Sequence, residues 1–534
     1  MAKWQQKRSF WTWGFVSDEP SDADRKRAAL TVAARTGTAV DPPPVPKLED
    51  IEVRPPRLSV PEALRDWVTT DHEERLLHTH GGHPLELQAA LRGQFDNPPD
   101  AVAHPQNEDQ LEATLAWADK HAHAVIPYGG ATSVVWGVNV PEDAETAVTV
   151  DLDHLSQVLE LDEVSRAARI QAGMLGPDLE DALRPKGLTL RHFPQSFPWS
   201  TVGGWVATRS GGHYATNHTH IDDFVESIRM LTPTGWWESR RLPGSGAGPS
   251  PDRMVIGSEG TLGIISECWL RVQKRPTFRA TAPVVFPTWQ AGAEGTRQIV
   301  QAKLWPANLR LLDPVEARQS AGLDGEQTLL IVGFESAEVS QRANVAAAVA
   351  IARDAGGSVE DEAIRIDDGQ GQATGREGAV GAWRNAFIGV NAGLTNGLGL
   401  LADTFETSIT WDRFDEFDGY VRERVGEVLA RVLKGSATLS CRFTHVYPDG
   451  PAPYYSFSGV GKLGGELEQW QEIKHAATEA VVAAGGSVTH HHAVGRLHRP
   501  GYDKQRPELF ADAYRAAKAA VDPHGIMNRG VLFD

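Results

Sequence analysis

Three glycine-rich loops contain the residues with the clearest chemical potential. The first, residues 127–133 (PYGGATS), follows a short apolar run. Its glycines let the main chain approach a ligand, its successive N–H groups can point at an anion, and Thr132 and Ser133 add hydroxyl groups. A single glycine turn is more often structural than functional, so this loop indicates a ligand site only in combination with the other two.

The second loop spans residues 194–211 (PQSFPWSTVGGWVATRSG), and the third spans residues 257–265 (GSEGTLGII). Each is expected beside regular structure, so the three together suggest one extended ligand with a pyrophosphate. No G-x-G-x-x-G motif opens a strand–helix unit, and the GSGAG at 244–248 lies in a Ser- and Pro-rich stretch. This argues against a Rossmann nucleotide domain.

Three consecutive histidines, His490, His491 and His492, form a second candidate group. On a strand, His490 and His492 would share one face and His491 would point away, so at most two would face a single site. Histidine is a common metal ligand, and the run alone leaves a metal site open.

The composition excludes several classes of function. The 534 residues carry a formal net charge of −18, and no dense basic run interrupts it. Such a surface repels nucleic acid and anionic lipid, so a phosphate-bearing ligand needs a local donor site. Two cysteines are too few for a disulfide framework or a thiolate metal site. Because no long apolar stretch occurs, we expect a cytoplasmic protein.

Apolar periodicity and turn residues place the loops between regular elements. A helix is expected over 108–121 and another over 176–187, closed by Gly187. A hairpin over 226–239 turns at Pro233–Gly235. Further strands are expected at residues 123–127, 146–152, 157–161, 168–172 and 263–276.

The chain is long enough for two domains and an extension. We expect an N-terminal extension and helical segment over 1–97, in which the proline-dense residues 39–56 lie extended on the surface. The first domain is expected over 98–276 and the second over 277–500. Residues 501–534 then return to the first domain.

A short sequence repeat, called the echo below, occurs in the second domain. AGGSV occurs at 355–359 and again at 484–488, each time after a predicted helix. Each glycine pair suits a left-handed helix end, and each Ser-Val is expected to begin a strand. We interpret the echo as two related helix–strand halves of one antiparallel cap. Chance is the alternative, because Ala-Gly-Gly is a common helix stop.

The three loops, in this order and spacing, resemble the FAD-binding domain of vanillyl-alcohol-oxidase-type flavoproteins. Within that group the sequence is most similar to the alkyldihydroxyacetonephosphate synthase family. The resemblance includes FWTWGF at 10–15, FETSITWDR at 405–413, GGSVTHHHAVGRL at 485–497 and DPHGIMNRGVL at 522–532. It implies an α+β fold with a two-lobed FAD-binding (PCMH-type) domain and an α/β cap domain with an antiparallel sheet.

The resemblance implies a set of FAD-binding residues across the three loops and beyond them. Related covalent flavoproteins often have a histidine where this chain has Ala131, so we expect FAD to be bound non-covalently. In the second loop, Gln195 replaces the family's aspartate. The implied cofactor-binding residues are Pro127, Tyr128, Gly129, Gly130, Ala131, Thr132, Ser133, His192, Pro194, Ser196, Ser200, Thr201, Gly203, Gly204, Thr208, Arg209, Ser210, Gly211, Glu259, Gly260, Thr261, Leu262, Gly263, Ile264, Ile265 and Asn528.

The resemblance also implies catalytic residues in the cap. Tyr454 would be a proton donor and acceptor, and Arg310 and the histidines 490–492 would also be catalytic. A phenol has an ordinary pKa near 10, so Tyr454 needs a cationic or histidine neighbour to act as a base, and the histidines would provide one. The family favours proton transfer and substrate binding for them over a metal. Without the resemblance, Arg310 would be a strand-edge arginine in a surface salt bridge.

One departure from the family affects the substrate. The family's substrate-binding arginine lies thirteen residues before the Phe of FETS, which here is Ala392, and Arg384 lies eight residues further upstream. A shifted alignment would be needed to bring Arg384 into that role.

The first functional hypothesis is a transferase that exchanges the acyl group of acyl-dihydroxyacetone phosphate for a fatty alcohol in ether lipid synthesis. The alternative is an FAD-dependent oxidase or dehydrogenase of a hydroxy acid or alcohol. A non-catalytic binding protein is the third. Expected partners are a small-molecule substrate, possible peripheral membrane contact through a lipid chain, and a possible homodimer.

Overall fold

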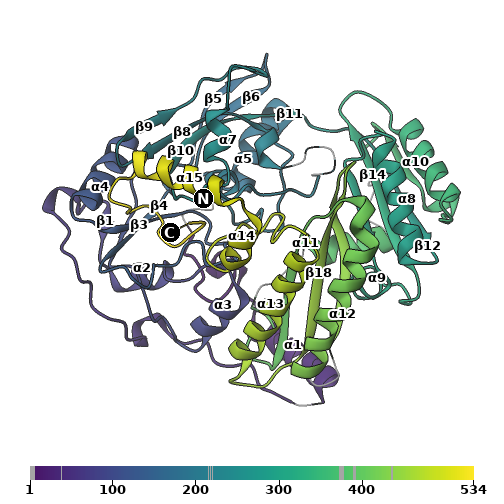
Figure 1. Cartoon of the computed structure of the whole chain (residues 1–534), viewed down its shortest axis with the longest axis horizontal. Helices are drawn as coiled ribbons and strands as arrows, with labels where there is room; N and C mark the ends of the chain where they lie inside the picture. Colours follow the sequence, from purple (N-terminus) through teal and green to yellow (C-terminus); the bar gives the residue numbers. More distant parts are fainter. Residues whose placement is uncertain are drawn as a thin grey trace.

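Two β-sheet lobes lie side by side and are joined by the two ends of the chain (Figure 1). The computed structural model describes residues 6–533 except 38, 215, 217, 219, 372–377, 389–392 and 434–436. The α+β fold implied by the resemblance is confirmed. Among the described residues, no helix is long and apolar enough to cross a membrane.

The first lobe contains the three glycine-rich loops. Its four-stranded sheet has the order β1–β2–β4–β3, and its five-stranded antiparallel sheet has the order β5–β6–β10–β8–β9. The predicted strands and hairpin of this lobe are present, except that the strand expected over 263–276 ends at Arg271 and residues 273–274 pair in a separate small sheet. The strands are β1 (Val68–Thr69), β2 (Ala101–Ala103), β3 (Ala124–Tyr128), β4 (Ala147–Asp151), β5 (Val158–Asp162), β6 (Ala167–Gln171), β8 (Val225–Thr232), β9 (Gly235–Glu238) and β10 (Ile264–Arg271).

Short helices surround these sheets, and both predicted helices are present. The helix expected over 108–121 is α4 (Glu108–Lys120), and the one closed by the left-handed Gly187 is α5 (Gly176–Leu183) with a following 3-10 turn. The other helices are α2 (His72–Leu77), α3 (Pro84–Leu91), α6 (Val202–Thr208) and α7 (Pro251–Val255). A small strand pair, β7 (Leu188–Thr189) and β11 (Gln273–Lys274), lies at the side facing the second lobe.

The second lobe is one seven-stranded antiparallel sheet with the order β15–β12–β14–β13–β17–β18–β16. Both halves share the pattern strand, helix, strand, strand, helix, to which the first half adds a helix between its second and third strands and a fourth strand at its end. The halves meet where β13 adjoins β17. This topology agrees with the interpretation of the AGGSV echo as two related halves. The strands are β12 (Phe278–Phe286), β13 (Asn308–Leu312), β14 (Thr328–Ser336), β15 (Arg365–Asp368), β16 (Leu400–Glu406), β17 (Thr438–Val446) and β18 (Pro451–Val460).

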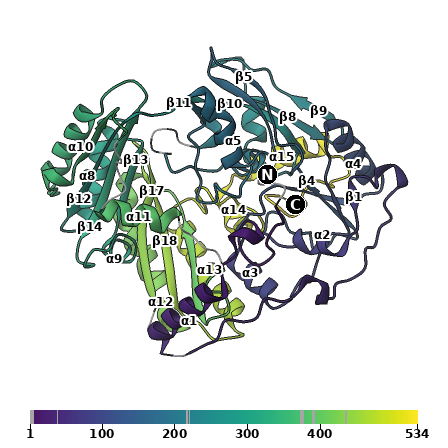
Figure 2. The same ribbon diagram turned by 180° about the vertical axis from the view of Figure 1, so that it is seen from behind.

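The two faces of this sheet differ in their cover. Helices α8 (Trp289–Gln301), α10 (Arg342–Asp354), α12 (Phe414–Val432) and α13 (Glu466–Ala483) enclose the main core on one face. On the other face, α9 (Pro314–Ala321) and α11 (Gly378–Ile388) cover only part of the sheet with a small core of their own (Figure 2). The rest of that second face is free to form a site.

Both ends of the chain connect the lobes. Helix α1 (Asp22–Thr36) packs its Ala28, Ala29 and Val32 against Leu398, next to β16 of the second lobe. After α14 (Arg499–Gln505) and α15 (Glu508–Val521), Met527 pairs with Val125 of β3. The expected C-terminal return to the first lobe is therefore present, whereas the domain boundaries at 97, 276 and 500 stay predictions.

One expectation about the echo is wrong. Gly356 and Gly485 are left-handed and end their helices as predicted. Ser-Val does not begin a strand at either place, since Ser358 makes only an isolated bridge and residues 487–492 form no strand. At the second place the physical reason lies in the site, where the main chain of residues 490–492 wraps around the carboxylate of Glu406.

Candidate active site

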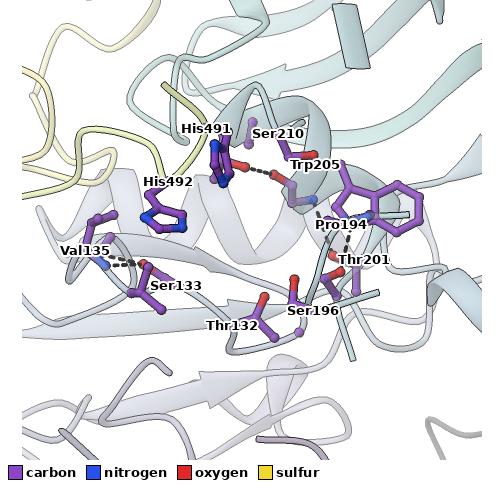
Figure 3. A pocket seen from close by; sticks show the side chains of 18 of the residues that line it. Thr132, Ser133, Val135, Pro194, Ser196, Thr201, Trp205, Ser210, His491 and His492 are labelled. Carbon is purple, nitrogen blue, oxygen red and sulfur yellow. Dashed lines mark hydrogen bonds between the residues drawn. The ribbon is translucent and has the colours of Figure 1, made fainter. Parts of the chain in front are cut away.

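A pocket lies between the three loops of the first lobe and the open face of the seven-stranded sheet. Figure 3 shows His491 and His492 on one side of it and Thr132, Ser133, Ser196 and Thr201 on the other. Most of the cofactor-binding residues implied by the resemblance line it. These are Pro127, Tyr128, Gly129, Gly130, Ala131, Thr132, Ser133, Pro194, Ser196, Ser200, Thr201, Gly203, Gly204, Thr208, Ser210, Gly211, Glu259, Gly260, Gly263, Ile265 and Asn528.

The first loop presents free main-chain donors to this pocket. No described residue accepts a hydrogen bond from the backbone N–H groups of residues 129–133. Ala131 is left-handed, with φ 59°, so the peptide groups around it change direction and form a concave donor surface. A Cβ at Gly130 would lie 2.0 Å from the carbonyl oxygen of Trp199, so only glycine allows the first loop to pack on the second. These donors, with Thr132 and Ser133, fit a pyrophosphate.

Five implied cofactor residues do not line the pocket, so their role in binding FAD stays a prediction. His192 Nε2 lies 2.8 Å from Ser210 Oγ, and Arg209 pairs with Asp222. The hydroxyl group of Thr261 contacts that of Tyr514. Leu262 and Ile264 are buried in the first lobe's core, because β10 begins at Ile264 and its side chains alternate between the sheet faces.

Strand alternation explains how the cap residues reach the pocket. Leu309 and Leu311 of β13 pack in the core under the helices, so Arg310 between them points to the opposite, pocket-facing side. The same alternation on β18 buries Tyr455 in the core and turns Tyr454 to the pocket.

A row of three side chains crosses the sheet at Tyr454. Its neighbours across the strands are Glu406 of β16 and Arg442 of β17. The guanidinium carbon of Arg442 lies 4.1 Å from the centre of the Tyr454 ring, and Arg442 Nη1 donates to Glu316 Oε1 at 2.8 Å. The Tyr454 hydroxyl donates to Thr404 Oγ1 at 3.1 Å. Tyr454 is therefore held in place on both its ring face and its hydroxyl group.

The histidine segment is held by two buried carboxylates. Glu406 accepts hydrogen bonds from the main-chain N–H groups of His490, His491 and His492. Glu259 of the third loop accepts from the N–H groups of residues 494 and 495. The expected strand geometry is therefore wrong, because adjacent His491 and His492 both line the pocket while His490 does not.

The electrostatics of Tyr454 also differ from the expectation. Burial lowers the pKa of His491 to about 3 and that of His492 to about 4, although Glu406 opposes this shift, so both rings are neutral near pH 7. The positive neighbour of Tyr454 is Arg442 instead. Burial raises the pKa of Tyr454, and Arg442 only partly offsets that rise. Tyr454 is therefore a protonated phenol near pH 7.

Arg310 is not the surface arginine that its sequence context suggests. It is 2% exposed, donates to the carbonyl oxygen of His213 at 3.1 Å and lies over the ring of Trp383. Burial and the nearby charge of Arg442 lower its pKa to about 9, which leaves it positively charged at neutral pH. The pocket wall therefore contains two guanidinium groups.

Ala392 lies outside the described residues, so its place relative to the pocket stays open. Arg384 does not line the pocket, but its charge contributes to lowering the pKa of His213, which does.

Several pocket residues were missed by the sequence reasoning, notably Trp13, His213, Arg442 and His445. Arg442 and His445 lie on a strand where a register shift between Phe443 and His445 marks a bulge. The bulge brings both Thr444 and His445 to the pocket. Alternation of Cys441 and Phe443 with Arg442 is the signal that could have indicated an inward arginine.

His445, His490 and His491 bring one ring nitrogen each within 4.8 Å of one another. This spacing is close enough for shared metal ligation or for direct hydrogen bonding. In the structure, Nδ1 of His490 and Nδ1 of His491 are 3.1 Å apart, which is a hydrogen-bond distance.

Comparison with known proteins identifies the ligand class. Residues 99–239 match the family model for the FAD binding domain, and residues 275–532 match the model for the C-terminal domain of FAD linked oxidases. An alkyldihydroxyacetonephosphate synthase of Caenorhabditis elegans is 29% identical over 92% of this chain and 86% of its own. The glycolate oxidase subunit GlcD of Bacillus subtilis is 25% identical over 87% of this chain and 97% of its own.

A solved alkyldihydroxyacetonephosphate synthase structure shares the fold, with a TM-score of 0.77 at 24% identity over 99% of this chain and 98% of that one. Together with the donor-rich pocket, these matches show an FAD-dependent enzyme. The chain contains both domains of the FAD-linked oxidases and is related along nearly its whole length to the alkyldihydroxyacetonephosphate synthases.

Proposed function

We propose that the chain exchanges the acyl group of acyl-dihydroxyacetone phosphate for a fatty alcohol, which forms an ether lipid precursor. The observation that carries this proposal is the pair of guanidinium groups in the pocket wall, Arg310 and Arg442, the second of which lies over the Tyr454 ring. On a chain with a net charge of −18, two guanidinium groups at one buried place point to an anionic substrate, although Arg442 already pairs with Glu316. A phosphate ester is such an anion, and arginine binds it with charge-assisted hydrogen bonds.

We propose that the pocket-lining residues of the three loops hold FAD, with the free N–H groups of residues 129–133 at its pyrophosphate. When bound, FAD supplies an electron-accepting ring system at which the substrate reacts. Because Ala131 cannot form a bond to FAD, the cofactor is dissociable.

The chain's own residues bind the substrate and move its protons. Arg310 and Arg442 bind the phosphate and orient the substrate toward Tyr454. Tyr454 donates a proton from its hydroxyl group to the leaving group, and the neutral ring of His492 or His491 accepts the proton of the entering alcohol. A positioned proton carrier of this kind contributes typically ~10²–10⁴-fold to the rate.

Incubation of the purified, FAD-loaded protein with acyl-dihydroxyacetone phosphate and a long-chain alcohol tests the proposal. We expect the ether product and free fatty acid in equal amounts, with the flavin spectrum oxidised at the end. An oxidase or dehydrogenase would instead bleach its flavin on anaerobic mixing with a hydroxy acid and form no ether. That result would favour the alternative, an FAD-dependent oxidase or dehydrogenase. The similarity to a glycolate oxidase subunit supports this alternative. Cytoplasmic location, peripheral membrane contact and a homodimer stay predictions.

A further inference from the structure

His490 links the pocket to the partly exposed Tyr447 through two hydrogen bonds. Its Nε2 lies 3.0 Å from the Tyr447 hydroxyl group, and its Nδ1 lies 3.1 Å from Nδ1 of His491. His490 itself does not line the pocket, whereas His491 does. The three side chains therefore form an unbroken hydrogen-bonded path.

The two ends of this path lie in different environments. Tyr447 begins the turn between β17 and β18, is only partly buried, and is followed by the exposed Pro448 and Asp449. His491 lies in the pocket (Figure 3). Its ring stacks with that of Tyr454 at 5.9 Å between centroids. The path thus runs from a surface turn to the proposed proton carrier.

The surroundings keep both rings in the form that a proton path requires. Burial and neighbouring histidines hold the pKa of His490 well below its ordinary value, and burial does the same for His491. A neutral imidazole has one donor and one acceptor nitrogen, so it can take a proton on one side and release one on the other.

The groups that face His490 leave this path intact. The rings of His220 and His445 flank it at 4.7 and 4.9 Å, and the carboxylate of Glu406 holds its main-chain N–H group. Tyr447 faces the charges of Asp222, Asp223, Asp449 and Arg209.

We propose that Tyr447, His490 and His491 form a proton relay between solvent and the pocket. Water gives a proton to the Tyr447 oxygen as Tyr447 passes its own to His490 Nε2. His490 then passes the proton on Nδ1 to His491 Nδ1, and His491 releases one from Nε2 into the pocket. One proton enters and one leaves, and both rings change tautomer without a net charge. The relay serves the reaction of the proposed function, and the inference rests on that function. Tyr447 is a positioning residue that acts through His490.

Reduction of the FAD-loaded protein by reduced methyl viologen tests the relay without any substrate. Two viologen radicals supply two electrons and no protons, so the proton that FAD takes up must come from solvent. A pH-indicator dye records that uptake in a stopped-flow instrument. In Tyr447→Phe we expect proton uptake slowed by about tenfold or more, within the range of positioned proton carriers. The solvent deuterium isotope effect should rise with it.

Two further variants separate the relay from a structural effect. His490→Ala should also slow uptake, and free imidazole in the buffer should restore it by occupying the space that the ring leaves. Tyr455→Phe is the matched control, because its hydroxyl bonds to Asp418 in the core and not to the pocket. It should keep the wild-type rate.

Wild-type uptake rates in Tyr447→Phe, or no rescue of His490→Ala by imidazole, would overturn the relay. A wild-type protein that forms no ether would contradict the proposed function instead, and would leave this substrate-free measurement valid.

Discussion

At the scale of single residues, the site depends on which side chains the strands turn toward the pocket. Tyr454 could be placed from the family resemblance, and the glycine-rich loops from their residue types. Alternation could have indicated an inward Arg442, but its partner across the hairpin could not be predicted, because the bulge before His445 shifts the register by one residue. Counting back symmetrically from the turn would have put Phe443 opposite Tyr454. The arginine's partner is a property of the fold and not of the local sequence.

Tyr454→Phe should abolish turnover and leave FAD bound. The variant loses the hydroxyl group that donates to Thr404 and is proposed to donate to the substrate, but keeps the ring that covers Arg442. We expect a fall in kcat of ~10²–10⁴-fold with an unchanged flavin spectrum. Tyr455→Phe is the control. Near-normal turnover of Tyr454→Phe would move the proton-donor role to another residue.

The flavin should be released completely when the protein is denatured by acid or heat. Ala131 stands in the first loop where related proteins carry a tethering histidine, and an alanine side chain cannot bond to FAD. The measurement is the flavin absorbance of the supernatant after precipitation. Flavin that stays with the precipitated polypeptide would show a covalent link to another residue.

At the scale of elements, the segment 489–495 shows why the site could be predicted only in part. Its three histidines were recognised from the sequence, but their geometry was not. On a strand, His491 and His492 would point to opposite faces. Instead, the carboxylate of Glu406 accepts hydrogen bonds from three successive N–H groups, and both rings point into the pocket. Glu406 is distant in sequence, so no local sequence pattern predicts its contact with the main chain of residues 490–492.

Glu259 should make stability depend on pH through the same segment. Burial raises its pKa to about 7 from an ordinary value of 4.5, although residues 494 and 495 donate to it. A raised carboxyl pKa stabilises the fold fully below about pH 4.5, and that contribution is lost as the pH rises through 7. The full loss corresponds to roughly 3 kcal/mol.

Glu259→Gln keeps an acceptor but cannot ionise, so the wild type should lose stability relative to this variant between about pH 5 and pH 8. Urea unfolding midpoints of the two proteins across this range provide the measurement. A difference that stays constant with pH would mean that Glu259 does not titrate in the folded state.

At the scale of the whole molecule, the pocket lies where separate parts of the chain meet. The loops of the first lobe form one wall, and the junction of the cap's two halves, at β13 and β17, provides Arg310 and Arg442 for the other. Trp13 of the N-terminal extension also reaches it. A pocket between lobes is a common place for a ligand site. The acidic surface and the buried cations together favour a small anionic substrate over any polyanion.

The most direct test of this account is the binding of dihydroxyacetone phosphate and of uncharged dihydroxyacetone, each titrated into the FAD-loaded protein and followed by the flavin absorbance. One charge-assisted hydrogen bond contributes ~1.5–3 kcal/mol, or roughly ten- to a hundredfold in affinity. We predict that the phosphate binds more tightly by at least that factor, and that Arg442→Met removes most of the difference while the exposed-site control Arg431→Met preserves it. Equal affinity of the wild type for the two ligands would contradict an anion-binding pocket and, with it, the proposed substrate.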